Sequence, residues 1–174
     1  MLKTLLTFFA GKPQATSPKV QPPAKPSSGK ARSVASEVTE LVKTRKSANT
    51  PLMDIRNELY QMFDGYSDLA LMTACMKAAD KIEDTLVNRN LRGKEFVKSG
   101  EPSKAIKLYE SNLLDHFDGS HPYERLRIIY NSKGKYQDVI RVCQAFIDFG
   151  GNDPELKEKY RTIITKLAQE PSSP

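Results

Sequence analysis

Cysteine is scarce in this chain of 174 residues, which contains only Cys75 and Cys143. Both stand among apolar residues at helical spacing, and neither belongs to a CxxC motif or a Cys/His cluster. The pattern therefore predicts neither a disulfide framework nor a zinc site. A reducing, cytoplasmic location fits this cysteine usage better than an oxidising one.

Long apolar runs are also lacking, because no stretch approaches the roughly 18 consecutive apolar residues of a membrane-spanning helix. Hydrophobic residues make up 39% of the chain and charged residues 28%. This balance is typical of one modest globular domain accompanied by some unpacked chain. We therefore expect a soluble body.

The sequence motifs of common catalytic sites are missing, since there is no P-loop, GxSxG or GxGxxG. The turn DHFDGSH brings His116 and His121 near Asp115 and Asp118, but these side chains lack the i, i+4 display of known helical metal sites. A turn that ends one helix and caps the next at Ser120 explains them without a metal. We expect no cofactor, no small-molecule substrate and no enzyme activity.

Acidic residues are scarce at the N-terminal end. Residues 1–50 contain nine Lys/Arg and two Asp/Glu. Residues 51–174 contain 18 Lys/Arg and 19 Asp/Glu, so the net charge of +6 comes from residues 1–50. A folded protein that reads nucleic acid normally carries a basic patch on its own surface. The near neutrality of residues 51–174 argues against such a function for the folded part.

Residues 1–32 are predicted to form a disordered basic arm. Five prolines and a single large aliphatic residue between positions 11 and 32 favour a semi-stiff linker that does not fold. Residues 1–10 (MLKTLLTFFA) carry one apolar stripe, and three interpretations stay open: a weak signal peptide, a short amphipathic anchor or docking helix, and an apolar start without a role. Weak binding of nucleic acid or a membrane is expected only from this arm.

Residues 33–65 are predicted to form two helices. Ser33 is expected to cap the first helix, and Thr50 to cap the second with Pro51 at its first helical position. The second helix is expected to end at the Asp-Gly pair of residues 64 and 65.

A third apolar pattern at helical spacing begins at Ser67, and no Gly or Pro interrupts residues 66–92. Two alternatives stay open: one long helix that continues into the next part of the chain, or a break at the polar residues 88–90. The stripe of Met72, Cys75 and Met76 is interpreted as core packing rather than as a cofactor or metal site.

Residues 88–149 repeat themselves at an offset of 34 residues. Such self-similarity is typical of stacked helical hairpins. The segments LRGKEFVKSGEPSKAIKLYE and LRIIYNSKGKYQDVIRVCQAF resemble the tetratricopeptide repeat (TPR) family, whose repeat is a helix, a tight turn and a second antiparallel helix. The aligned pairs are Phe96 with Tyr130, Gly100 with Gly134, Ala105 with Val139, and Ile106 with Ile140.

This resemblance implies an all-α fold, in which residues 66–170 form a short TPR-like stack of helical hairpins (an α-solenoid) beside the two helices of residues 33–65. Gly93 and Ala105 would let the helices of the first hairpin approach closely, and Gly100 would take the left-handed turn conformation. A last helix, capped by Asp153, would cover the end. The departures from the family pattern are Asn112, Arg127 and Phe146, each of which replaces a small residue.

The resemblance also implies a function in protein–protein interaction. A concave groove along the first helix of each hairpin would hold a peptide or partner protein, with Lys94 and Lys98 as a basic edge for an acidic or carboxylate-bearing ligand. The carboxylate clamp of some TPR proteins is not carried over, because Asn and Lys stand in the reverse order here. The alternative function is a peripheral tether, whose arm binds a membrane or nucleic acid while the helices assemble. The groove residues by family register are Asn90, Lys94, Val97, Lys98, Glu124, Ile128 and Asn131.

Overall fold

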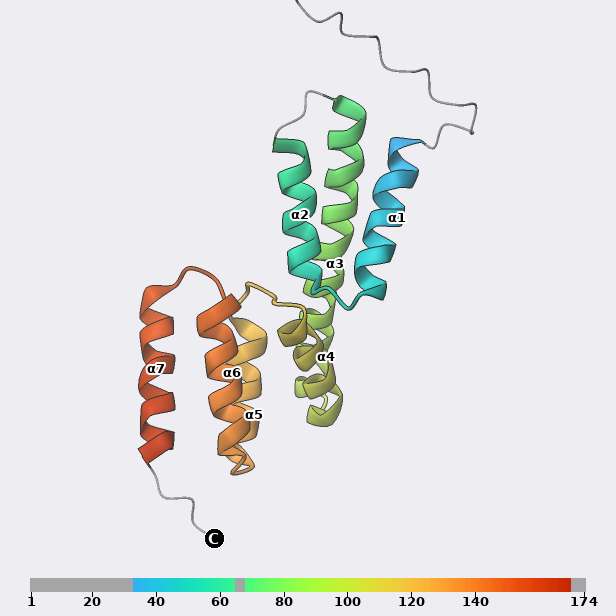
Figure 1. Ribbon diagram of the computed structural model, residues 1–174. Helices are drawn as coiled ribbons and strands as arrows, with labels where there is room; N and C mark the ends of the chain where they lie inside the picture. Colours follow the sequence, from blue (N-terminus) through green and yellow to red (C-terminus); the bar gives the residue numbers. More distant parts are fainter. Residues whose placement is uncertain (1–32, 65–67, 170–174) are drawn as a thin grey trace, which may run out of the picture. The chain divides into compact units, whose positions relative to one another are not determined.

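The computed structural model describes residues 33–64 and 68–169, and the predictions for the arm of residues 1–32 lie outside this part of the chain. Within the described residues all regular structure is helical, with seven α-helices and no strand, so the all-α prediction is confirmed. Figure 1 labels the helices, which are α1 (Val34–Ser47), α2 (Leu52–Asp64), α3 (Leu69–Lys98), α4 (Pro102–Leu114), α5 (His121–Ser132), α6 (Tyr136–Phe149) and α7 (Pro154–Gln169).

Several helix ends follow signals that the sequence carries locally. The Ser33 hydroxyl accepts a backbone hydrogen bond in the first turn of α1, and the Asp153 carboxylate does the same at the start of α7. Gly100 and Gly134 have φ angles of 75° and 66°, in the left-handed region that favours glycine. These positions confirm the caps predicted at Ser33 and Asp153 and the turn predicted at Gly100. Ser120 does precede α5, but its side chain makes no capping hydrogen bond, so that predicted cap lacks its hydroxyl contact.

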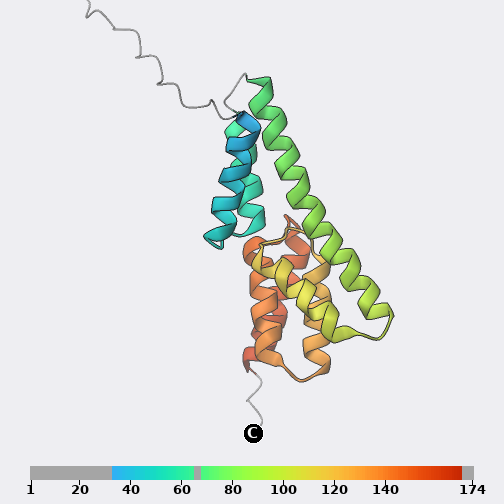
Figure 2. The same cartoon turned by 90° about the vertical axis from the view of Figure 1, so that its right-hand side faces the viewer.

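The helix α3 is continuous over 30 residues, so the first of the two alternatives is confirmed and the polar residues 88–90 lie inside it (Figure 2). It begins one residue after Asp68, whose carboxylate accepts hydrogen bonds from the Ala70 and Leu71 amides. Ser67, the predicted start, lies outside the described residues.

Two clusters of buried apolar side chains lie along α3. The first joins α1 and α2 to α3 as far as Leu86, and the second joins α4, α5, α6 and α7. Phe96 and Val97, near the end of α3, pack against the second cluster. From α3 onward each helix packs on the helix that follows it in sequence. The long helix thus contributes to both cores.

Two local predictions were wrong. The helix α2 begins at Leu52, one residue after Pro51, so Thr50 is not its cap; the Pro51 carbonyl accepts the first hydrogen bonds of the helix. Met76 is 44% exposed, whereas Cys75 beside it is fully buried. Only part of the predicted Met/Cys stripe therefore belongs to the core.

Candidate peptide-binding face

The residues predicted to line a groove lie on two helices. Ile128 is 40% exposed, and all the others are exposed or partly buried, so each can contact a ligand. We call this set the α3–α5 face. It consists of Asn90, Lys94, Val97 and Lys98 on α3 and of Glu124, Ile128 and Asn131 on α5.

Tyr109 of α4 connects α3 to α5. Its fully buried ring lies against Gly93 of α3, where a Cβ atom would be only 2.5 Å from Tyr109 Cε1. The ring also meets His121, the first residue of α5, edge-on with ring centroids 5.9 Å apart. The close approach predicted at Gly93 is therefore made to Tyr109 rather than to Ala105.

His121 has an electropositive environment. Burial is the main cause that lowers its pKa, and the cations Arg125 and Lys94 lower it further, while Glu124 acts in the opposite direction. Lys94 of α3 therefore lies within electrostatic range of the first turn of α5, which also carries the positive end of the helix dipole. These charges favour a neutral imidazole and attract an anionic group.

Three residues on or beneath this face each bury a polar atom that has no hydrogen-bond partner among the described residues. The atoms are Asn90 Oδ1, the Tyr109 hydroxyl and His121 Nε2, which come from α3, α4 and α5. A buried polar atom that lacks a partner costs about 1–3 kcal/mol. The three atoms comprise an amide oxygen that accepts, a hydroxyl that donates and a ring nitrogen that does either, according to its tautomer.

Arg127 of α5 packs on Tyr160 of α7. Arg127, which stands where the TPR resemblance expects a small residue, places its guanidinium 5.9 Å from the centre of the Tyr160 ring. Burial raises the pKa of Tyr160 to about 12. Arg127 lowers the pKa of Tyr160 through its charge and a side-chain hydrogen bond, although the geometry of Arg127 Nε and of the Tyr160 hydroxyl falls short of a regular one. Arg56 Nε and Asn112 Oδ1 are the other two buried polar atoms without a partner in the described part of the chain.

The two histidines of the DHFDGSH turn do not converge. His116 stacks on Phe149 with ring centroids 3.6 Å apart, and its Nδ1 lies 3.3 Å from Oδ1 of Asp54. His121 instead contacts Tyr109. In residues 33–64 and 68–169, no group of three or more His, Cys, Asp or Glu side chains is placed to hold a metal ion.

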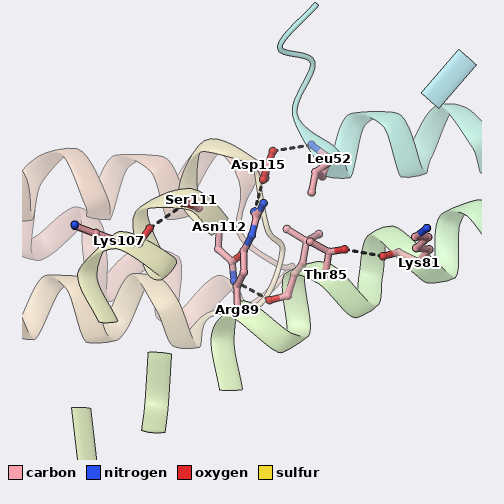
Figure 3. A network of polar contacts seen from close by, with 9 residues as sticks. Leu52, Lys81, Thr85, Arg89, Lys107, Ser111, Asn112 and Asp115 are labelled. Atoms are coloured by element: carbon pink, nitrogen blue, oxygen red, sulfur yellow. Dashed lines mark hydrogen bonds and ion pairs between the residues drawn. The ribbon is translucent and has the colours of Figure 1, made fainter. Parts of the chain in front are cut away.

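A polar junction between α2, α3 and α4 was not predicted (Figure 3). Asp115, directly after α4, accepts a hydrogen bond from the Leu52 amide through Oδ1 at 3.1 Å and forms an ion pair with Arg89 of α3 through Oδ2. Its carbonyl accepts from the Met53 amide at 3.2 Å. Asp115 therefore caps a helix that begins 63 residues earlier in the sequence.

Asn112 adds a buried contact to the same junction. Its Nδ2 donates to the Leu86 carbonyl of α3 at 2.9 Å, which gives an amide a role where the TPR resemblance expects a small residue. A cavity of about 530 Å³ opens at the junction and is lined in part by Lys46, Thr85 and Ser111. The hydroxyls of Thr85 and Ser111 donate to carbonyls within their own helices. The junction thus stabilises the contact between the two cores.

Within the described residues, no helix combines the length and the apolar character that crossing a bilayer requires. No family model, curated protein or solved structure matches this chain. The resemblance to the TPR family therefore stays a prediction.

Proposed function

We propose that the protein is a non-enzymatic protein–protein interaction module, an adaptor or scaffold whose α3–α5 face binds an acidic or carboxylate-bearing peptide of a partner protein. In this proposal the helices from α3 to α7 form a short TPR-like stack of hairpins. The α3–α5 face is its concave side, along the first helix of each hairpin. The protein acts in the cytoplasm, where its free thiols stay reduced.

The observation that carries the proposal is the basic environment of His121, where the exposed Lys94 of α3 and the partly buried Arg125 of α5 lie close enough to lower its pKa. His121 also meets the Tyr109 ring edge-on, and its Nε2 is buried without a hydrogen-bond partner among the described residues. About 90% or more of buried polar atoms in folded proteins have a partner, so an exception beneath a basic surface favours a binding role. A carboxylate of a bound peptide would pair with the two cations.

The cysteines and histidines of the described part of the chain lie in different environments. Cys75 and Cys143 are buried, and burial raises the pKa of both thiols, that of Cys143 to about 11, so they stay protonated at neutral pH. His116 and His121 both contact aromatic rings. A nucleophile paired with a base, which covalent catalysis requires, is not formed by these groups.

The test is a reversal of charge at Lys94 and Lys98. The double variant Lys94→Glu, Lys98→Glu should keep its stability, because exposed charges each contribute under about 1 kcal/mol to folding. It should lose acidic partners, because like charges facing each other across an interface cost several kcal/mol. The matched control, Lys107→Glu with Lys159→Glu, makes the same change of net charge at exposed positions of α4 and α7.

The measurements are an affinity pull-down with each full-length variant and a thermal melting curve of each. Loss of partners only in the Lys94, Lys98 variant, with both variants as stable as the parent, is the expected result. Equal capture by parent and variant would exclude this face as the binding surface. An equal loss in the control would mean that net charge, not this face, determines binding.

A further inference from the structure

A second surface lies between α1 and the first half of α3. Two adjoining cavities of about 330 and 520 Å³ open there, and both are lined by Ala35, Ala74 and Lys77. On α3 the lining runs from Leu69 to Ile82, which corresponds to about 20 Å at a rise of 1.5 Å per residue. We call this surface the α1–α3 groove.

The groove has a recessed apolar floor. Val38 of α1 and Ile82 of α3 line it and are only 3% and 2% exposed. Ala35 and Ala74 are too small to fill the space beside them, so the floor stays open to a ligand. At one end Leu69 leaves 69% of its surface exposed. Because Val38 and Ile82 are already almost fully buried, an apolar ligand would mainly remove the surface of Leu69 and of the alanine methyl groups from water.

The rim of the groove is basic. Lys46 on α1 and Lys77 and Lys81 on α3 line the cavities, and the lining residues include no Asp or Glu. Among the residues that the structure describes, none of these three lysines forms an ion pair. Glu83, farther along α3, pairs instead with Arg56 of α2. Asp80 and Asp84 follow Lys77 and Lys81 by three residues on α3 but form no ion pair with them in the described part of the chain, so the rim lysines keep their ammonium groups free for a ligand.

We propose that the α1–α3 groove binds an amphipathic helix of a partner protein, whose apolar stripe is flanked by Asp and Glu. A helix laid in an apolar groove is a common mode of recognition, and the length of this groove matches about three and a half helical turns. The uncompensated lysines select the acidic flanks. A flat bilayer surface would reach the lysines and Leu69 but not the recessed Val38 and Ile82. The groove lies apart from the α3–α5 face and does not depend on it.

The experiment measures binding of a fluorescent helical peptide of about 15 residues, with Leu at positions i, i+3, i+4 and i+7 and Glu on both flanks. A second peptide carries Lys in place of each Glu. The full-length parent should bind the Glu peptide and not the Lys peptide. Lys77→Glu with Lys81→Glu should weaken binding at least about tenfold. The control Lys107→Glu with Lys159→Glu should not weaken it, although its net charge is the same.

The variant Ala74→Lys separates the groove from simple charge attraction. It adds a positive charge but fills the space, so a ligand seated in the groove should bind more weakly, whereas attraction by charge alone should become stronger. Circular dichroism melting curves check each fold, and Lys77→Ala with Lys81→Ala replaces the reversal variant if that variant unfolds.

Three results would overturn the proposal. The first is peptide binding that Ala74→Lys leaves equal or tighter. The second is binding to phosphatidylserine vesicles but not to the peptide, which would make the groove a membrane contact. The third is self-association of the parent that Ala74→Lys abolishes, which would assign the groove to a second copy of the chain.

Discussion

Replacing Asp115 with alanine should destabilise the protein by about 2–3 kcal/mol, because this one side chain links three helices. Its Oδ1 accepts from the Leu52 amide at 3.1 Å, at the start of α2, and its Oδ2 pairs with Arg89 of α3. The side chains of Asp115 and Arg89 are only 20% and 28% exposed. Water therefore replaces neither interaction completely.

The magnitude follows from two contributions. Loss of an N-cap acceptor costs typically about 1 kcal/mol. Leaving Arg89 partly buried without its carboxylate adds about 1–2 kcal/mol, a value at the low end because the guanidinium keeps some contact with water. Asp115→Asn retains an oxygen that can accept from Leu52 and loses only the charge, so it should cost about half as much. The hydrogen bond from Met53 to the Asp115 carbonyl is kept in both variants.

The assay is equilibrium unfolding in urea, monitored by circular dichroism. It compares Asp115→Ala, Asp115→Asn, Arg89→Ala and the double variant Asp115→Ala, Arg89→Ala. The double-mutant cycle should give a coupling of about 0.5–2 kcal/mol between Asp115 and Arg89. The control is Asp118→Ala, because Asp118 is 48% exposed and its pair with Arg56, at 3.3 Å, should be worth under about 1 kcal/mol. An Asp115→Ala effect no larger than this control, or a coupling near zero, would refute the assigned role.

The remaining predictions concern packing, pH and the arm. Gly93→Ala should destabilise the folded protein by about 1–3 kcal/mol, because the new Cβ would lie 2.5 Å from the buried Tyr109 ring. This cost should exceed the gain from the higher helix preference of alanine, and an unchanged urea midpoint would disprove the contact. Stability should fall as the pH drops below about 6.5, because the pKa of His121 is lowered in the folded state and the unfolded chain therefore takes up the proton first. His121→Gln should flatten this part of the stability–pH curve, and a curve identical to that of the parent would contradict the prediction. If residues 1–32 bind polyanions through charge alone, retention of the full chain on heparin should fall steeply between about 50 and 200 mM salt, whereas salt-insensitive binding to anionic vesicles would favour insertion of residues 1–10.

The helix ends that the sequence predicts correctly depend on neighbours within one turn of helix. Ser33 and Asp153 cap the helices that directly follow them, and Gly100 and Gly134 take left-handed conformations within tight turns. Because each effect acts over a few residues, a short window of sequence contains the information needed. The all-helical fold follows from the same local patterns.

The contacts that form the junction and the α3–α5 face join residues far apart in the sequence. Helical spacing predicts that Tyr109 is buried, but it does not say that the ring meets Gly93 and His121. Likewise no local signal pairs Asp115 with a helix that begins 63 residues earlier. Met76 shows the opposite error, since an apolar pattern places it on a stripe of α3 that neighbouring helices cover only in part. Such contacts are set by packing between elements, which periodicity alone does not encode.

Tyr109 offers a test of whether the α3–α5 face is kept for binding. Tyr109→Phe removes a buried hydroxyl that has no partner among the described residues but keeps the ring against Gly93, so the free energy of unfolding should stay the same or rise by about 1 kcal/mol or more. The control is Tyr123→Phe, because Tyr123 is equally buried and its hydroxyl donates to the Phe117 carbonyl at 2.7 Å. Loss of the Tyr123 hydroxyl should lower the free energy of unfolding by about 1 kcal/mol.

Stability and binding should therefore change in opposite directions at this position. If binding opens the face far enough for a peptide to reach the buried Tyr109 hydroxyl, the phenylalanine variant should bind the acidic partner more weakly although it is at least as stable as the parent. A group that lowers the stability of the free chain yet strengthens a complex is expected at a functional site, where selection accepts the cost. Equal binding by variant and parent would instead mean that water satisfies the hydroxyl and that no ligand uses it. A loss of stability as large as that of Tyr123→Phe would assign the hydroxyl to the fold.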